Sequence, residues 1–302
     1  MSLRNRDTGY YGENISALNE FAIEEINNPS SKDPLINAAI VTDLQKLVLD
    51  IYARDQEHRL ILKESTFSKV NVHRSAINSD HLWLISKQGN LVAYLSGSHI
   101  YTDLGEQVYV FKACMVAVEV DNKGELFSRL YARQIIRGVL SYWNSASNLG
   151  KPMPFITRTL NPIVAQTVYS LGTNMYPCLD GLPISDRVRD RHRAFEKVIN
   201  ESIGDDGILV NSFMKHSDYK LRPTKGKSKR SKIYSFCRSL GDTDGAVLTG
   251  ELVFGDDFIH HLQEKISGDH ISMGDLGLVN LLRDSAQQQA LSMSETQSFG
   301  GC

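Results

Sequence analysis

The stretch Met115-Val116-Ala117-Val118-Glu119-Val120-Asp121-Asn122-Lys123-Gly124-Glu125-Leu126-Phe127-Ser128-Arg129-Leu130 decides the fold of this chain. An apolar run ends at a short polar turn with one glycine, and an amphipathic pattern starts directly after it. This succession predicts a strand, a tight turn and the start of a helix. Because a helix start presents unpaired N–H groups and the positive end of the dipole, such a junction suits a phosphate or pyrophosphate. We therefore expect a cofactor here.

The elements on either side of this junction are also readable. The apolar run extends back to Val108, interrupted by Lys112 and Glu119, and its valines and aromatic residues favour a strand. From Phe127 the period becomes helical. The apolar face holds Phe127, Leu130, Tyr131, Ile135, Val139, Tyr142 and Trp143, and a polar face holds Glu125, Arg129, Arg133 and Arg137. A short strand at Met153–Thr159 follows, and Asn161-Pro162 starts another helix that runs to Gly172.

The flanking regions add further elements. Leu18, Phe21, Ala22 and Ile26 give a short helical pattern, and Asp33-Pro34 opens a second helix. His81–Ser86 and Asn90–Ser96 form a hairpin around Lys87-Gln88-Gly89. Further on we expect a helix over Arg187–Asn200, three strands at Gly207–Phe213, Lys232–Arg238 and Gly245–Phe254, and a short helix over Phe258–Ile266.

Composition is that of an ordinary soluble globular protein. The 302 residues are 41% hydrophobic and 23% charged, with a formal net charge of −2, so no global pull toward nucleic acid or anionic lipid is expected. No apolar run approaches a membrane span, and the N-terminus lacks the apolar core of a secretory signal. The four cysteines are far apart, which argues against a zinc site and a disulfide framework. These features indicate a cytoplasmic protein without a metal.

The order of these elements resembles that of the GNAT superfamily of acyl-CoA N-acyltransferases. Helices come first, then a hairpin, a long strand, a turn, a helix, a short strand and a helix ending in glycine. Val118 and Lys123-Gly124 match that family's central motif, whereas Asp121 and Leu126 depart from it. The second element, Asn161 to Gly172, resembles the family's Asn…Tyr…Leu-Gly helix, although Tyr169 stands one residue beyond the family position at Val168.

The resemblance implies an α/β (α+β) fold with a mixed, mostly antiparallel central sheet flanked by helices and a C-terminal extension. We expect one domain over residues 1–285. Its motif region is 81–173, with C-terminal strands and a substrate-side extension over 183–285. Residues 286–302 form a Gln-, Ser- and Gly-rich tail that composition predicts to be disordered.

The resemblance also implies acyl-CoA, with an acetyl or longer acyl chain, as co-substrate. The turn would wrap the pyrophosphate with backbone N–H groups, and the pantetheine arm would pair with the strand edge. Leu126 adds bulk where the family has glycine, so either the turn has another shape or cofactor binding is weakened. The expected cofactor-binding residues are Val116, Val118, Val120, Lys123, Gly124, Glu125, Leu126, Phe127, Ser128 and Asn161.

The expected reaction transfers the acyl group to an amine of a small molecule or peptide. Strand alternation places Glu119 on the face of Phe111, beside an apolar row that would raise its pKa, so Glu119 is the candidate base. Tyr169 is the candidate acid that protonates the leaving thiolate. Arg158 either binds a substrate carboxylate or the cofactor, or forms a structural ion pair. Lys112 either extends its ammonium to solvent or pairs with a carboxylate. The sequence leaves the oligomeric state open, a dimer included.

One competing hypothesis concerns the segment Lys220–Lys232, which holds seven basic residues among thirteen. On this hypothesis the scaffold has lost catalysis and recognises an acidic peptide or nucleic acid through this segment. Aromatic residues for base stacking are missing from it, which makes nucleic acid the less favoured partner. The alternative is a solvated loop.

Overall fold

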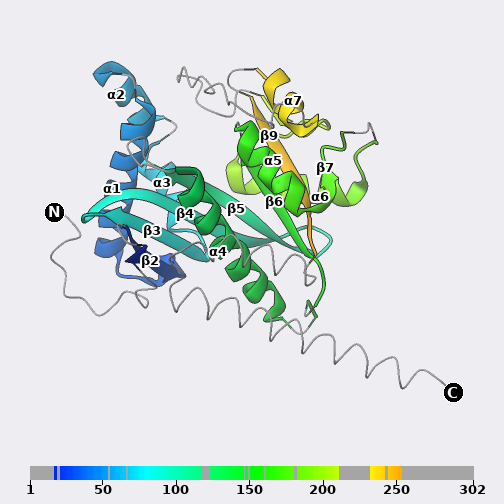
Figure 1. Ribbon diagram of the computed structural model, residues 1–302, viewed down its shortest axis with the longest axis horizontal. Coiled ribbons are helices and arrows are strands. Elements are labelled where there is room, and N and C mark those ends of the chain that lie inside the picture. The colour runs from blue at the N-terminus through cyan, green and yellow to red at the C-terminus, as the bar shows by residue number, and fades with distance from the viewer. Residues whose placement is uncertain are drawn as a thin grey trace.

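The protein folds as a sheet flanked by helices, as a computed structural model shows (Figure 1). The predicted helix at 258–266 and the tail at 286–302 lie outside the described residues. The structure describes residues 17–18, 21–53, 55–65, 67–116, 123–145, 147–148, 150–159, 161–179, 182–210, 232–241 and 244–253, with the backbone alone at 17–18, 113–116, 123–129 and 163.

One nine-stranded sheet runs through the described residues in the order β1-β2-β3-β4-β5-β6-β9-β7, with β8 beside β9. All its pairs are antiparallel except β5–β6, which is parallel. This confirms the mixed, mostly antiparallel sheet flanked by helices. The strands are β1 (Ala17–Leu18), β2 (Phe21–Asn27), β3 (His81–Lys87), β4 (Asn90–Tyr101), β5 (Gln107–Val116), β6 (Met153–Thr159), β7 (Thr173–Tyr176), β8 (Ile208–Leu209) and β9 (Gly245–Leu252).

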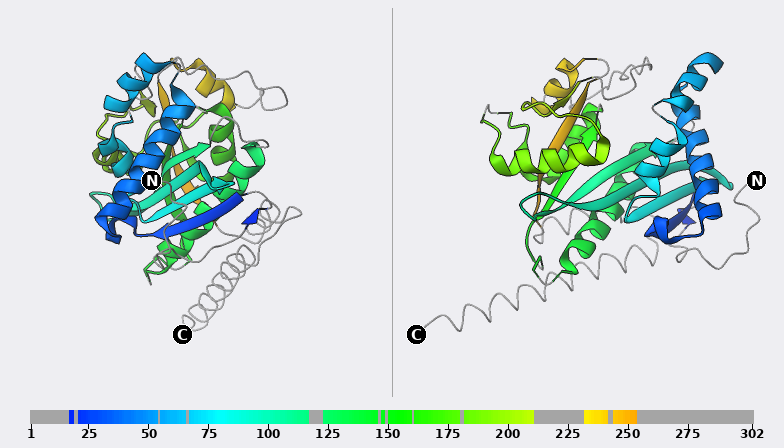
Figure 2. Two further views of the ribbon diagram at one scale, coloured as in Figure 1. Left: turned by 90° about the vertical axis from the view of Figure 1, so that its left-hand side faces the viewer. Right: turned by 180° about the vertical axis from the view of Figure 1, so that it is seen from behind.

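Helices cover both faces of the sheet (Figure 2). Tyr109 and Phe111 of β5 pack with residues of α4 and α5, whereas Val108 and Val110 pack with Phe195 of α6. We call these sides the α4 face and the α6 face; α1 and α3 also lie on the α6 face. The helices are α1 (Pro34–Tyr52), α2 (Gln56–Glu64), α3 (Lys69–Ala76), α4 (Lys123–Trp143), α5 (Pro162–Leu171), α6 (Asp186–Ile199) and α7 (Lys232–Ser239), with a 3₁₀ turn at Pro29–Ser31.

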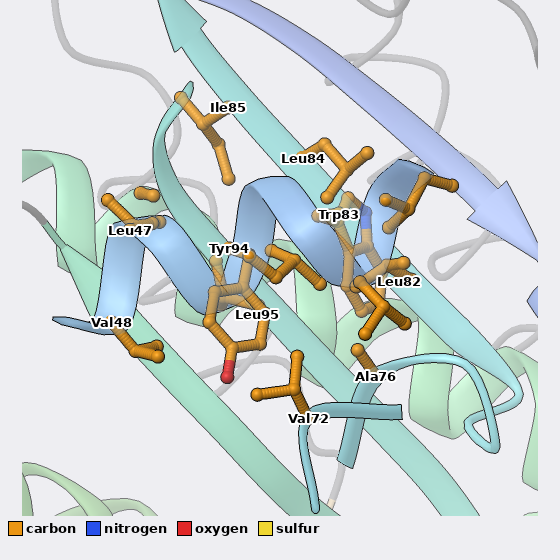
Figure 3. Packing of buried hydrophobic residues seen from close by; sticks show 14 of the residues in the cluster. Leu47, Val48, Val72, Ala76, Leu82, Trp83, Leu84, Ile85, Tyr94 and Leu95 are labelled. Carbon is orange, nitrogen blue, oxygen red and sulfur yellow. The ribbon is translucent and has the colours of Figure 1, made fainter. Parts of the chain in front are cut away.

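The core over β3 and β4 shows why the first half of the sheet is tightly built (Figure 3). Leu47 and Val48 of α1 pack with strand residues such as Leu84, and Val72 of α3 belongs to the same cluster.

Asp33 starts α1 by accepting a hydrogen bond from the Leu35 amide at 2.7 Å, with Pro34 in the first helical position.

The two described residues of the polar stripe predicted for α4, Arg133 and Arg137, are turned toward the protein. Arg133 is only 3% exposed, and Arg137 Nε lies 2.8 Å from Oε1 of Glu25 on β2. Burial raises the pKa of Glu25, and the Arg137 guanidinium opposes that shift. Because a buried carboxylate needs a cation, the stripe fixes how α4 lies across the sheet.

Several predicted elements are confirmed. The helix that begins after Asp33, the strand Met153–Thr159 and the helices α5 and α6 lie at or within one or two residues of the expected bounds. The hairpin is also present, and its second strand, β4, runs five residues beyond the expected Ser96 to Tyr101. Gln88 and Gly89 have φ angles of 50° and 75°, which is the left-handed geometry that a two-residue hairpin turn requires.

Two predicted elements were wrong. Phe21–Asn27 is a strand, because β2 is buried on both faces: Ile23 and Ile26 are each at most 2% exposed and point to opposite sides. Burial on both faces produced a three-residue spacing that resembles a helix. Lys232–Arg238 is helix α7, because Ile233 and Cys237, four residues apart, bury one face in the α5 cluster.

Candidate site at the opening between β5 and β6

The site is built where two parallel strands separate. Pairing of β5 with β6 consists of Tyr109↔Phe155, Val110↔Ile156 and Phe111↔Thr157. Beyond this level β5 continues to Val116 and β6 to Thr159 without pairing to each other. The Thr157 hydroxyl donates to the Phe111 carbonyl at 3.3 Å and is the last bond across the junction that the described residues show. We call the space beyond it the opening.

A β-bulge at Lys112 explains why the strands separate. On β4, Ser96 and Gly97 are consecutive, but their partners on β5 are Ala113 and Phe111, so Lys112 is an extra residue. An extra residue bends the strand and increases its twist, and the β5–β6 pairing ends at Phe111, directly before it. Gly97 stands opposite the bulge, and a Cβ there would lie 2.1 Å from the Tyr109 hydroxyl oxygen, so only glycine fits.

The bulge interrupts the strand alternation on which the expectation for Glu119 rests. Gly97 shares the α4 face with its partner Phe111, whereas Ser96 faces α3, to whose Ser75 carbonyl its hydroxyl donates at 2.6 Å. Its register partner on β5 is Ala113, two residues beyond Phe111. Glu119 itself, with Val118 and Val120, lies outside the described residues.

Helix α4 is the next described element after β5. It begins at Lys123, four residues before the expected change of period, so Lys123 to Ser128 already belong to its first turns. The amides of the first four residues of a helix have no acceptor within it, and the positive dipole end lies there. The predicted contacts at Lys123, Gly124, Glu125, Leu126, Phe127 and Ser128 therefore fall on a helix start; their side chains are outside the description, as is that of Val116.

Helix α5 starts in the corresponding place beyond β6. The Asn161 carbonyl accepts the Ala165 amide at 2.9 Å, and the Asn161 amide donates to Thr159 Oγ1 at 3.0 Å. Pro162 occupies the first helical position. Asn161 is therefore held at the carboxyl end of β6, beside the opening. Two adjacent parallel strands, each followed by a helix start, form the edge of a sheet where ligands of α/β proteins bind.

The candidate acid Tyr169 lies seven residues into α5, which is about 10 Å along the axis from its start. It is partly buried against the α4–α5 cluster, and its hydroxyl donates to the Pro177 carbonyl at 3.3 Å. Gly172, at the end of the same helix, allows close packing, because a Cβ there would lie 2.2 Å from Met175 Sδ and 3.1 Å from Phe155. The described contacts of Tyr169 are those of a packing residue, and its role as acid stays a prediction.

Two cations occupy the first register level beyond the last β5–β6 pair. Arg158 Nη1 lies 3.0 Å from Oε1 of Glu201, which follows α6. The Lys112 ammonium donates to the carbonyl of Asn78, in the turn after α3. Burial lowers the pKa of Lys112 to about 8, with Asp80 acting in the opposite direction. Sequence reasoning had singled out both cations but could not find their partners, because Asn78 is 34 and Glu201 is 43 residues away.

At the other end of β5, before the first β5–β6 pair, lies an ionic cluster that the sequence did not reveal. Arg191 of α6 is 2% exposed; its Nε and Nη2 lie 2.7 and 2.8 Å from the two carboxylate oxygens of Glu106. Its Nη2 also lies 3.0 Å from Oε1 of Glu251 on β9. The Arg191 charge holds the pKa of Glu106 below its usual range, against the effect of burial. The charged helix pattern was visible in the sequence, but its partners are 60 and 85 residues away.

The basic segment, metal binding, membrane spans and the cysteines were also considered in the sequence. Of the basic segment, only Lys232 is described; it opens α7, which packs against α5. Within the described ranges, no group of three or more His, Cys, Asp or Glu side chains is placed to share a metal ion. None of the described helices has both the length and the apolar content needed to cross a bilayer. Cys178 and Cys237 are free thiols.

Comparison with known proteins yields only distant similarity. No family model matches the chain, and no curated protein matches it. The chain is similar to the AtaTR structure bound with acetyl-CoA (11% identity, 57% of this chain and 90% of that chain, TM-score 0.31). It is also similar to a mutant AtaT toxin bound to the C-terminus of the antitoxin AtaR and acetyl-CoA (12% identity, 57% of this chain and 90% of that chain, TM-score 0.29). A third similar structure is the loading GNATL domain of CurA from Lyngbya majuscula (11% identity, 76% of this chain and 97% of that chain, TM-score 0.29). These values are too low to add to the geometry of the opening itself.

Proposed function

We propose that the protein is an acyl-CoA-dependent N-acyltransferase that holds its donor in the opening between β5 and β6. The acyl group is acetyl or longer, and the acceptor is an amine of a small molecule or peptide. The observation that supports this most directly is the bulge-driven separation of two parallel strands, because it leaves the edge of β5 beyond Phe111 unpaired toward β6.

An unpaired strand edge suits the pantetheine arm of coenzyme A. The arm contains two amide groups, and a strand edge offers alternating N–H and C=O groups at the spacing of a neighbouring strand. The start of α4, only seven residues beyond Val116, offers backbone N–H groups to the pyrophosphate. The pantetheine arm would thus bind the edge of β5, and the pyrophosphate of the same ligand would bind the start of α4.

The proposed chemistry is direct transfer within one ternary complex. The amine nitrogen attacks the thioester carbonyl carbon, a C–N bond forms and the C–S bond breaks. An ammonium acceptor loses two protons, one to the leaving thiolate and one to solvent. We propose Glu119 as the group that takes up the proton to solvent and Tyr169 as the donor to sulfur. Most of the acceleration would come from holding the two reactants in line.

Calorimetric titration with acyl-CoA from acetyl to palmitoyl tests the proposal. We expect binding by at least one chain length, and Lys123→Glu should weaken it about tenfold, since a like charge would face the pyrophosphate. Lys151→Glu is the matched control, because Lys151 is an exposed lysine in the loop before β6. No binding at any chain length would overturn the proposal, as would equal losses in the two variants.

A second measurement separates chemistry from binding. Release of coenzyme A thiol is followed with a panel of amines. We expect Glu119→Gln to lower kcat while the acyl-CoA affinity stays unchanged. Unchanged turnover in this variant would remove Glu119 from the mechanism. Donor binding without turnover, together with salt-dependent binding of acidic ligands through Lys220–Lys232, would instead favour the binding-module hypothesis.

A further inference from the structure

Two cationic side chains, Lys112 and Arg158, lie on the same face of the sheet at the level where β5 and β6 separate. The last pair across the junction is Phe111↔Thr157, and Lys112 and Arg158 are the next residues on their strands. Val110 and Ile156, two residues earlier, pack together under Phe195 on the α6 face. Arg158 shares the α6 face with Ile156, because side chains two residues apart on a strand share a face. Lys112 is the extra residue of the bulge, and its bond to Asn78 after α3 places its ammonium on the same side.

Their present partners tether these cations on two sides of the opening. Asn78, in the turn after α3, accepts from the Lys112 ammonium, and Glu201, after α6, holds Arg158 at 3.0 Å. The two partners belong to different parts of the chain, so one cation is drawn toward α3 and the other toward α6. Arg158 and Glu201 have side-chain exposures of 27% and 33%, and Lys112 is also partly exposed, so a small molecule reaches them from solvent.

The charge of Lys112 is only partly balanced. An ammonium has three donors, and one of them is used on a neutral carbonyl. Within the described part of the chain, no carboxylate lies within ion-pair distance of Lys112. A partly buried cation that bonds to a neutral group gains free energy when an anion arrives.

We propose that the acceptor is an amine that also carries a carboxylate, and that this carboxylate binds between Lys112 and Arg158 on the α6 face. This inference rests on the proposed function and names its substrate class. Donor and acceptor would approach the opening from different sides. The donor would lie along the edge of β5 toward the start of α4. The acceptor would enter from the α6 face, between the turn after α3 and the segment after α6, with its nitrogen directed at the thioester.

The experiment compares matched acceptors. Thiol release is measured with amino acids and their α-amides, using a donor that binds, and ethanolamine and phosphoethanolamine serve as a neutral amine and a phosphate-bearing amine. We expect the acids to be used and the amides to lose about 10- to 100-fold in kcat/KM, as for loss of a charge-assisted bond. Lys112→Met and Arg158→Gln should each abolish most of that preference. Equal use of acids and amides, or preference for phosphoethanolamine, would overturn the inference.

Two controls keep the result independent of folding. Lys197→Met and Arg189→Gln remove exposed cations that are ion-paired elsewhere, and the preference should persist in both. Glu201→Gln removes the carboxylate that competes for Arg158, so the KM of the acid should fall. A misfolded protein cannot produce that gain, and an unchanged or higher KM would contradict the inference.

A binding measurement separates this inference from the proposed function. With coenzyme A present, an N-acyl amino acid should raise the Tm more than its amide, and Lys112→Met should remove the difference. Donor binding without this discrimination overturns the substrate class alone. Failure of every acyl-CoA to bind overturns the acyltransferase proposal, and the substrate class with it.

Discussion

The two ends of the junction between β5 and β6 are built in opposite ways. At the closed end, before Tyr109, Arg191 is buried between Glu106, which precedes β5, and Glu251 of β9. At the open end, Lys112 and Arg158 are partly exposed and each is held by a residue of a different loop. β6 meanwhile pairs with β9 along its whole length, from Met153↔Leu252 to Thr159↔Ala246. The sheet thus consists of two well-paired halves joined by three residue pairs. A buried ionic cluster holds the junction at one end, and β5 and β6 are not paired with each other at the other end.

This contrast teaches that stability and the proposed function depend on different ends of one junction. The closed end satisfies its charges within the protein, so a ligand has nothing to gain there. At the open end, backbone groups of β5 and two cations have partners that a ligand can replace or supplement. Changes at the closed end should therefore alter the free energy of unfolding, and changes at the open end should alter ligand binding.

The largest expected effect is the loss of the closed end in Arg191→Met. Glu106 and Glu251 would lose their buried cation and keep only the exposed Arg187, so the free energy of unfolding should fall by about 3 kcal/mol. Denaturant unfolding measures it. Arg189→Met is the matched control: its ion pairs with Asp186 and Asp205 are exposed, and removing them should cost at most about 1 kcal/mol. Equal losses of unfolding free energy in the two variants would show that the buried ionic cluster adds no more stability than an exposed ion pair.

The next effect is a loss of stability at acid pH through His192, which follows Arg191 on α6 and packs against Tyr176. Burial lowers the pKa of His192 to about 4, with Asp205 opposing, whereas a histidine in the unfolded chain has its ordinary pKa of 6.5. Between these values the unfolded chain binds the extra proton, so this contribution to stability is complete above pH 6.5 and is lost as the pH falls toward 4.

The difference between wild type and His192→Phe isolates this group. Phenylalanine keeps a ring against Tyr176, and it removes the titration. His81 and His99 shift in the same direction, and Glu24 and Glu25 in the opposite one, but all four are common to both proteins. Unfolding measured from pH 7 to pH 4.5 should show wild type losing up to about 1.4 kcal/mol per pH unit relative to the variant. A constant difference would refute the assignment.

A smaller loss is expected where the bulge begins. In Gly97→Ala the new Cβ would lie 2.1 Å from the Tyr109 hydroxyl oxygen, and the free energy of unfolding should fall by about 1–3 kcal/mol. Because the strain falls on Tyr109, Gly97→Ala with Tyr109→Leu should lose less than the two single changes together. Simple addition of the two losses would mean that this contact does not set the strand geometry.

Local sequence signals were enough for the elements around the junction. Asp33-Pro34 and Asn161-Pro162 marked helix starts, because a capping side chain or a proline at the first position is a local property. The strand Met153–Thr159 was bounded correctly by Pro152 and the following Asn161-Pro162. In contrast, β2 and α7 were assigned wrongly, because their patterns depend on which faces are buried by residues far along the chain.

The site was less predictable for the same reason. The junction from β5 to α4 was visible, but the bulge at Lys112 is defined by the register with β4, which no local pattern reports. That one extra residue interrupts the regular alternation of β5. Partners such as Glu201 for Arg158 and Glu106 for Arg191 are brought together only by the topology of the sheet.

The smallest expected effect compares the β5–β6 pairing with the β6–β9 pairing. Each contains a buried threonine whose hydroxyl donates to a backbone carbonyl of the neighbouring strand. Thr157 donates to the Phe111 carbonyl at 3.3 Å where β5 and β6 separate, and Thr249 donates to the Phe155 carbonyl at 2.8 Å within the closed β6–β9 pairing. Valine in place of either should cost about 1 kcal/mol of unfolding free energy, since one hydrogen bond is lost. Only Thr157→Val should also change the affinity for acyl-CoA, because only that bond sets where the opening begins. Calorimetry on both variants measures this, and equal affinities in the two would separate the opening from the proposed donor site.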